Sequence, residues 1–222
     1  MIVTQQIPLQ FEHRSALSSK DFLVSDSNRE AVEWIDCWPS WLSPTIAING
    51  PSGAGKTHLG VIFIERTQGQ IFDTANPVAW IENAAGTWLV DDAHNFIKHA
   101  GEKAFLHFYN AVIEAKGNIL FLDQRPPSQW PLSLPDLRSR ILTALVVEIL
   151  SPDDALLSAV LVKLLADRQL TVGAQVIDYV LPRMERSFVA AGNLVERLDR
   201  LALAEKREIT IPLAKRVLSS KI

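Results

Sequence analysis

The chain has 222 residues, of which 48% are hydrophobic and 21% are charged, and its formal net charge is −3. This length allows one domain with a buried core plus a small appendage. The slightly acidic balance argues against nonspecific duplex DNA binding over the whole surface. The single cysteine excludes an intramolecular disulfide and a multi-cysteine zinc site. Nothing suggests export, and no run approaches about 18 apolar residues, so we expect a cytoplasmic protein without a membrane partner.

The predicted elements alternate between helix and strand through the first two thirds of the chain. Helices are predicted at 27–38, 57–68 and 103–115, and buried strands at 45–49, 77–81, 87–90, 118–122 and 146–150. This alternation specifies the α/β class, a parallel sheet with helices on both faces. Four helical segments then follow without a strand, at 153–169, 174–184, 191–203 and 211–219. We therefore expect an extended tail at 1–12, an α/β subdomain at 13–150 and a small all-helical subdomain at 151–222.

One motif carries specific chemistry. Residues 50–57, Gly-Pro-Ser-Gly-Ala-Gly-Lys-Thr, match the phosphate-binding pattern G-x-x-x-x-G-K-[ST] between a predicted strand and a predicted helix. Glycines let the backbone turn its N–H groups toward phosphate oxygens, beside the positive end of the helix. Lys56 is expected to reach the β/γ-phosphates, and the Thr57 hydroxyl is expected to bind Mg²⁺. A Gly-rich turn alone is the alternative, but the motif favours binding of a nucleoside di- or triphosphate.

Two further strand ends carry polar side chains. The strand at 87–90 ends in Asp91 and Asp92, and we assign Asp91 to the metal and Asp92 to the attacking water. An ordinary Asp-Asp loop is the alternative interpretation. The strand at 118–122 ends in Asp123 and Gln124, either of which could position that water. The sequence leaves open which of the two faces the site.

The segment at 134–140 carries two guanidinium groups, those of Arg138 and Arg140, just before an apolar run. Arginine stabilises the charge that develops on a transferred phosphoryl group, within one chain or across a subunit interface. Without the other motifs, solvated surface arginines would be the better interpretation.

The order of these motifs along the chain, with a helical lid after them, resembles that of AAA+ ATPases related to the bacterial replication initiator DnaA. We expect neither the initiator's N-terminal interaction domain nor its DNA-binding domain, because the 222 residues leave no room for them. The chain is similar to the Hda family of short DnaA homologues. That resemblance implies ADP or ATP with Mg²⁺ as ligands, and DnaA and the DNA polymerase sliding clamp (beta subunit) as partners. It implies that the protein promotes ATP hydrolysis by the initiator, and that any contact with DNA is indirect. Self-association stays open.

The resemblance assigns roles residue by residue. Arg140 matches the family's arginine finger, and the segment at 21–28 matches the adenine-binding segment at two positions. The catalytic residues expected are Asp92, Asp123 and Arg140. The nucleotide contacts expected are Phe22, Asn28, Pro51, Ser52, Gly53, Ala54, Gly55, Lys56, Thr57 and His58. The other histidines show no metal-ligand spacing, so surface or packing roles are expected for His94, His99 and His107.

The tail is similar to a clamp-binding peptide of the form Gln-x-x-Leu-x-Phe. Leu9 and Phe11 would enter an apolar pocket, Gln6 would bond its rim, and Pro8 would keep the peptide extended. The alternative is that Leu9 and Phe11 dock on their own domain.

One family element is poorly matched. Val195 occupies the position at which the family's lid contributes an arginine to the nucleotide, which leaves Arg183, Arg186 or Arg197 as substitutes. This departure puts hydrolysis of the chain's own nucleotide in doubt. The competing hypothesis is a stand-alone AAA+ ATPase of the helicase-loader type.

Overall fold

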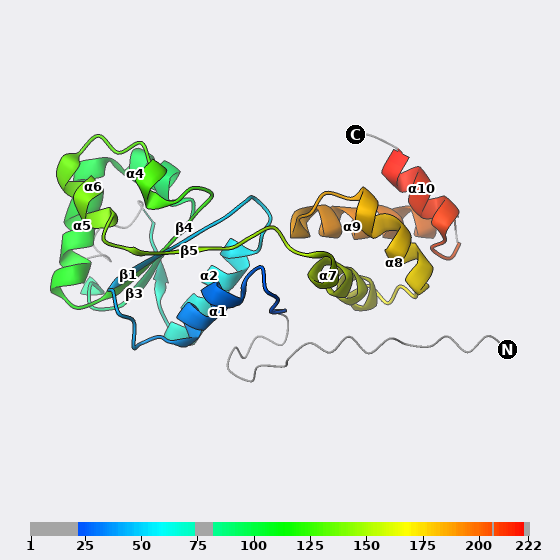
Figure 1. Ribbon diagram of the computed structural model, residues 1–222, viewed down its shortest axis with the longest axis horizontal. Helices are drawn as coiled ribbons and strands as arrows, with labels where there is room; N and C mark the ends of the chain where they lie inside the picture. Colours follow the sequence, from blue (N-terminus) through cyan, green and yellow to red (C-terminus); the bar gives the residue numbers. More distant parts are fainter. Residues whose placement is uncertain (1–21, 74–81, 206, 220–222) are drawn as a thin grey trace. The chain divides into compact units, whose positions relative to one another are not determined.

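The computed structural model describes residues 22–73, 82–205 and 207–219, which divide into two compact units (Figure 1). Asn28–Ser151 with Phe22 form an α/β unit, and the chain from Pro152 onward with Leu23–Ser27 forms a helical unit. We call the second unit the lid. Among the described residues, no helix combines the length and apolarity that crossing a membrane requires.

The α/β unit is built from strands and helices that follow one another along the chain. Its elements are α1 (Arg29–Asp36), β1 (Thr45–Asn49), α2 (Lys56–Thr67), β2 (Gln70–Ile71), β3 (Thr87–Val90), α4 (Ala93–Ala100), α5 (Glu102–Glu114), β4 (Asn118–Asp123), a 3₁₀ turn (Pro127–Gln129), α6 (Pro135–Ile141) and β5 (Leu145–Glu148). All residues of β1 and β3 are buried, as expected for strands covered on both faces.

The described strands form one parallel sheet in the order β2-β3-β4-β1-β5. β4 therefore lies between β1 and β3, with Asn49 opposite Asp123 and Val90 opposite Phe121. Because the strands are parallel, the residues that follow β1, β3 and β4 meet at the same edge of the sheet. Those residues include the phosphate-loop motif and the predicted carboxylates.

Helices cover both faces of this sheet (Figure 1). On one face, α4, α5 and α6 pack against β4 and its neighbours through an aromatic-rich core that contains Phe105, Phe108, Phe121 and Trp130. On the other face, α2 packs against β3 and β4, and α1 packs against β5. A methyl group added at Gly60 of α2 would lie 2.7 Å from Leu122 Cδ1, so this helix lies directly on the sheet.

The lid contains α7 (Asp154–Asp167), α8 (Ala174–Val180), a 3₁₀ turn (Leu181–Arg183), α9 (Phe188–Glu205) and α10 (Ile211–Ser219). The Asp153 side chain accepts a hydrogen bond from Leu156 N and caps α7. Leucine, valine and isoleucine side chains from all four helices form the lid's own core. This second core lets the lid be a separate folding unit.

The predicted fold class is confirmed: a parallel sheet with helices on both faces is followed by a helical lid. Most predicted elements are present, with ends displaced by one to a few residues, and the last strand ends at Glu148 rather than at 150. The helix predicted at 174–184 ends as a 3₁₀ turn that contains a proline. The prediction missed β2, α4 and α6. The strand predicted at 77–81 and the tail lie outside the described residues.

Two helical glycines provide a matched test of how tightly α2 packs. Gly60→Ala is expected to lower the free energy of unfolding by about 1–3 kcal/mol, because the added methyl would meet Leu122 and Leu89. Gly192→Ala in α9 is expected to raise it by about 0.5–1 kcal/mol, since its methyl would meet no atom within 4 Å. Urea unfolding curves of the two variants measure both effects, and equal stabilisation by both would contradict direct packing of α2 on the sheet.

Candidate nucleotide-binding site

The phosphate-loop motif connects β1 to α2 at the carboxyl edge of the sheet. Gly55, at the residue before α2, has φ 95°, a left-handed conformation that L side chains avoid. Gly50 has a different constraint: a methyl group there would lie 2.2 Å from Ile149 O. Both glycines are therefore required by the backbone path that brings the loop to the start of α2.

Lys56 is buried, although it is the first residue of α2. Its Nζ donates to Gly50 O at 2.7 Å and to Pro51 O at 2.8 Å, which accounts for two of the three N–H donors of an ammonium group. Burial lowers the pKa of Lys56 below its usual value, and the carboxylates of Asp91 and Asp123 offset part of that shift. A buried cation in these surroundings fits an anionic ligand such as a phosphate group.

The predicted metal residues lie next to each other. Thr57 Oγ1 donates to Asp91 Oδ2 at 2.8 Å, across 34 residues of sequence. A hydroxyl and a carboxylate oxygen are hard ligands of the kind that Mg²⁺ prefers, together with phosphate oxygens and water. The donor set therefore fits the Mg²⁺ of a bound nucleotide.

Asp92, assigned to the attacking water, is exposed and has left-handed backbone with φ 50° and ψ 50° at the start of α4. Its carboxylate accepts from Asn95 Nδ2 at 3.0 and 3.2 Å, and its Oδ1 lies 3.9 Å from His94 Nδ1. Asp92 is thus at the same sheet edge as Lys56, but it already receives hydrogen bonds from its own helix.

Asp123 is buried at the end of β4, and its carboxylate is held by protein donors. Oδ2 accepts from His94 N at 2.8 Å and lies 2.7 Å from His94 Nδ1, while Oδ1 accepts from Arg125 N at 3.0 Å. Gln124, the other residue left open by the sequence, is exposed. Asp123 therefore ties β4 to the first turn of α4.

Asn49, the last residue of β1, lies beside Asp123 in the sheet register. Asn49 is 7% exposed, and its Oδ1 forms no hydrogen bond within the described structure. A buried amide oxygen without a donor is costly, so a ligand or a water molecule that donates to it would stabilise the site. Paired residues of parallel strands point to the same face, which places Asn49 beside Asp123 at the carboxyl edge of the sheet.

The residues expected near the adenine are only partly brought together. The half-buried Phe22 ring packs edge-on against the His58 ring with their centroids 5.3 Å apart. Asn28 is buried at the start of α1, where its carbonyl accepts from Val32 N. In the loop itself, Ala54 is buried, whereas Pro51 and Ser52 are exposed and Gly53 is half-buried.

Arg140 lies in the last turn of the short helix α6. Its side chain is 44% exposed, and its Nε lies 3.7 Å from Asp136 Oδ1 one turn earlier. An exposed pair of this kind is weak, so the guanidinium can reach a group outside the chain.

The three candidate lid arginines all bond within the lid. Arg183 donates to Tyr179 O at 2.7 Å and covers the Tyr179 ring, Arg186 pairs with Asp154 at 2.8 Å, and Arg197 donates to Val217 O. Val195, at the position where the family carries an arginine, is fully buried in the lid core. The lid helices thus use these arginines for their own packing.

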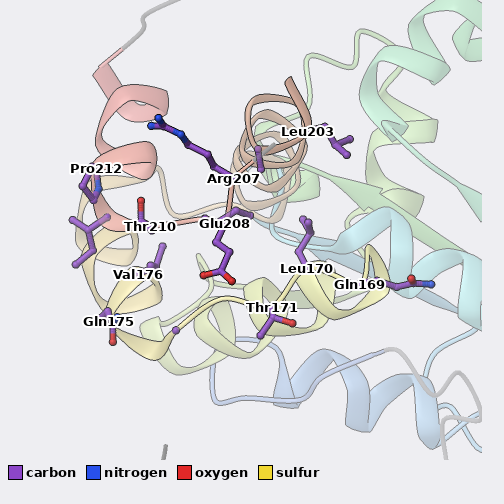
Figure 2. A pocket seen from close by; sticks show the side chains of 14 residues that line it. Gln169, Leu170, Thr171, Gln175, Val176, Leu203, Arg207, Glu208, Thr210 and Pro212 are labelled. Atoms are coloured by element: carbon purple, nitrogen blue, oxygen red, sulfur yellow. The ribbon is translucent and has the colours of Figure 1, made fainter. Parts of the chain in front are cut away.

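The lid also carries a groove, shown in Figure 2. It is lined by the α7–α8 and α9–α10 connections and by the adjoining ends of α8, α9 and α10. Its apolar side chains include Leu170 and Val176, and its polar ones include Arg207 and Glu208. None of the residues predicted for nucleotide, metal or arginine-finger roles lines it. The groove is therefore separate from the predicted chemistry.

His94 and Asn49 are the site residues that sequence reasoning missed. His94 was expected in a surface or packing role, but its ring and its backbone N–H both bond Asp123. Among the described residues, Asp92, His94 and Asp123 also form a group whose ligand atoms lie within 4.8 Å of one another. The signal available in the sequence was position: His94 lies two residues after an acidic strand end, and Asn49 directly precedes the phosphate loop.

Comparisons with known proteins identify relatives of the lid and of the overall fold. Residues 154–218 match the family model described as "Hda, lid domain". Domain III of the Thermotoga maritima replication initiation protein DnaA is 18% identical with a TM-score of 0.75, over 92% of this chain and 96% of that one. AMPPCP-bound DnaA from Aquifex aeolicus is 21% identical with a TM-score of 0.67, over 90% of this chain and 69% of that one. A Thermotoga maritima RuvB mutant is 13% identical with a TM-score of 0.68, over 86% of this chain and 68% of that one.

The likeness to the solved structures shows the fold, and the family match covers the lid alone, at residues 154–218. The AAA+ assignment made from the motifs is confirmed by these findings. The chain therefore combines a DnaA-like AAA+ fold, which carries a phosphate-loop motif, with a helical lid that matches the Hda lid model.

Proposed function

We propose that this protein is a DnaA-related, nucleotide-binding regulator of chromosomal replication initiation. In this proposal it binds the sliding clamp through Gln6, Leu9 and Phe11, and it stimulates ATP hydrolysis by the initiator through Arg140. The observation that carries the proposal is the exposed arginine of α6, held on an AAA+ fold whose lid matches the Hda family. The proposed address is the cytoplasm, where replication proteins act.

The chain's own nucleotide would be ADP or ATP, held by the phosphate loop. Lys56 would bind the β/γ-phosphates, and the Thr57 hydroxyl and the Asp91 carboxylate would bind Mg²⁺ directly or through water. Phe22 and Asn28 would contact the adenine, and His58 would be a further nucleotide contact. Two structurally similar proteins are DnaA molecules bound to AMPPCP, an ATP analogue, which supports a nucleotide in this position. Bound Mg²⁺ supplies charge neutralisation for the phosphates.

The action on the partner requires no residue of this chain's phosphate loop. A guanidinium placed beside the γ-phosphate of a neighbouring subunit stabilises the charge that spreads over the phosphoryl oxygens in the transition state. Arg140 has the required exposure, and its weak pair with Asp136 is easily exchanged for a phosphate. Stimulation of a partner's ATPase therefore needs docking and one positioned arginine.

The competing function, a stand-alone ATPase of the helicase-loader type, fits the site less well. It would need Asp92 and Asp123 to activate water and an arginine from the lid on the nucleotide. Asp123 is instead bonded to His94 and Arg125, and the three lid arginines bond lid groups. These contacts favour a nucleotide that is held rather than rapidly hydrolysed. Strong intrinsic turnover that is abolished by Asp92→Asn would reverse this preference.

Replacement of Lys56 tests the nucleotide site. Lys56→Ala is expected to weaken ADP binding at least about 10-fold, because the buried cation that faces the phosphates is lost. Binding by the wild type should also decline as the pH is raised toward the lowered pKa of Lys56, since the neutral amine no longer attracts phosphate. Titration calorimetry between pH 7 and 10 measures both effects. Lys163→Ala, in the lid, should bind ADP normally, and equal affinity of all three proteins would refute the site.

Replacement of Arg140 tests the action on the initiator. In a reconstituted reaction with initiator, clamp and DNA, Arg140→Ala should reduce the stimulated rate of ATP hydrolysis by roughly 10³-fold, the usual scale for an arginine finger. Arg138→Ala, on the same helix, serves as the matched control and should keep most of the stimulation. Normal initiator hydrolysis with Arg140→Ala would overturn the proposed mechanism.

The clamp contact is tested with the tail. A triple variant, Gln6→Ala/Leu9→Ala/Phe11→Ala, is expected to lose binding to immobilised sliding clamp, because the pocket anchors and the rim hydrogen bond are removed together. Its ADP affinity should equal that of the wild type, which shows that the folded units are intact. If the variant and the wild type are captured equally by the clamp, the tail is not the clamp-binding element.

A further inference from the structure

Helix α5 holds the short helix α6 at both ends. Glu102, the first residue of α5, accepts hydrogen bonds from Ser133 N at 2.9 Å and from Leu134 N. Tyr109, two turns further along α5, donates its Oη hydrogen to Arg140 O at 3.3 Å. Two side chains of one helix thus fix the beginning and the last turn of another.

The beginning of α6 depends on this external carboxylate. Leu134 occupies the N-cap position and has no side chain that can accept a hydrogen bond, and no side-chain cap bond is formed there. A negative charge near the first N–H groups is favourable because the helix dipole is positive at that end. Glu102 therefore accepts from the N-cap N–H of α6 as the N3 glutamate of a capping box does, but it does so from another helix.

The last turn of α6 is fixed through the backbone of the proposed arginine finger. Arg140 O accepts from Tyr109 Oη and also from Thr143 Oγ1 at 2.7 Å and Thr143 N at 3.1 Å. Tyr109 is 4% exposed, so its hydroxyl needs a partner inside the protein. The Arg140 side chain, in contrast, is exposed.

A helix of seven residues is too short to hold its own direction in water. Leu137 and Ile141 anchor one face of α6 in the core, and they leave its tilt and end positions to be fixed by polar contacts. Misplacement of a reacting group by about 1 Å costs around 10²-fold in rate. An arginine that must reach a partner's phosphate therefore needs a fixed backbone origin.

We propose that Glu102 and Tyr109 are positioning residues for Arg140. They set the point and direction from which its guanidinium leaves the surface, without contacting the partner's nucleotide themselves. This inference rests on the proposed function, and it adds two residues outside the matched motifs to the machinery of that function.

The test uses two variants that keep the size of each side chain. Glu102→Gln leaves one carbonyl oxygen for two N–H donors, and Tyr109→Phe removes only the hydroxyl. In the reconstituted reaction, each is expected to lower the maximal stimulated rate of initiator hydrolysis about 10-fold. The protein concentration that gives half of that rate should stay within about 2-fold of wild type, because docking surfaces are unchanged. The Ser133 and Leu134 amides of Glu102→Gln should exchange hydrogen about 10-fold faster.

Matched controls come from positions that do not contact α6. Glu114→Gln, at the exposed end of α5, and Tyr179→Phe, in the lid, should keep the wild-type maximal rate and half-saturating concentration. Glu102→Asp, which restores the charge on a shorter side chain, should recover part of the rate lost in Glu102→Gln.

Each remaining outcome contradicts a different statement. Wild-type maximal rates for both variants, with Arg140→Ala inactive, would overturn the positioning role and leave the proposed function intact. A loss of rate accompanied by weaker half-saturation and lower thermal stability would reduce Glu102 and Tyr109 to general structural residues, which also refutes the inference. Full stimulation by Arg140→Ala would refute the proposed function, and the positioning role with it.

Discussion

The buried ammonium of Lys56 is the constraint on which the site depends. Its desolvation is unfavourable, and the structure compensates with two loop carbonyls and with the nearby carboxylates of Asp91 and Asp123. Those carboxylates come from different strands, so they are near Lys56 only because β4 lies between β1 and β3. The strand order, the glycine-rich turn and the acidic strand ends therefore form one electrostatic arrangement, which a phosphate would complete.

The sequence predicted the parts of this arrangement that depend on local pattern. β1, β3 and β4 are continuous apolar runs that end in polar residues, and the glycine spacing between β1 and α2 is unambiguous. The helical periodicity of apolar residues likewise predicted the four helices of the lid. Helices α4 and α6 were missed because they are short, and because their buried residues, such as Leu137 and Ile141, are too few to show a clear period.

The remaining features depend on contacts between residues that are distant in sequence. Whether Asp123 or Gln124 faces the site follows from sheet register and burial, which place Asp123 beside Asn49 and leave Gln124 exposed. The bonds from His94 to Asp123 span 29 residues, and those from Glu102 to the start of α6 span 31 and 32. No local pattern encodes such pairs, so a histidine with an ordinary surrounding sequence became the link between β4 and α4.

The α4–α5 segment connects the carboxyl edge of the sheet, where the phosphate loop lies, to the helix that carries the proposed arginine finger. α4 begins at the His94–Asp123 contact, α5 follows after Gly101 alone, and α5 bonds the backbone of α6. Asp123 bonds His94 at the start of this segment, and the three candidate lid arginines bond groups within the lid. Lys56, Thr57 and Asp91 keep the geometry for holding phosphate and metal. This division of roles supports the proposal that the bound nucleotide stabilises the sheet edge and that the exposed Arg140 serves a partner's nucleotide.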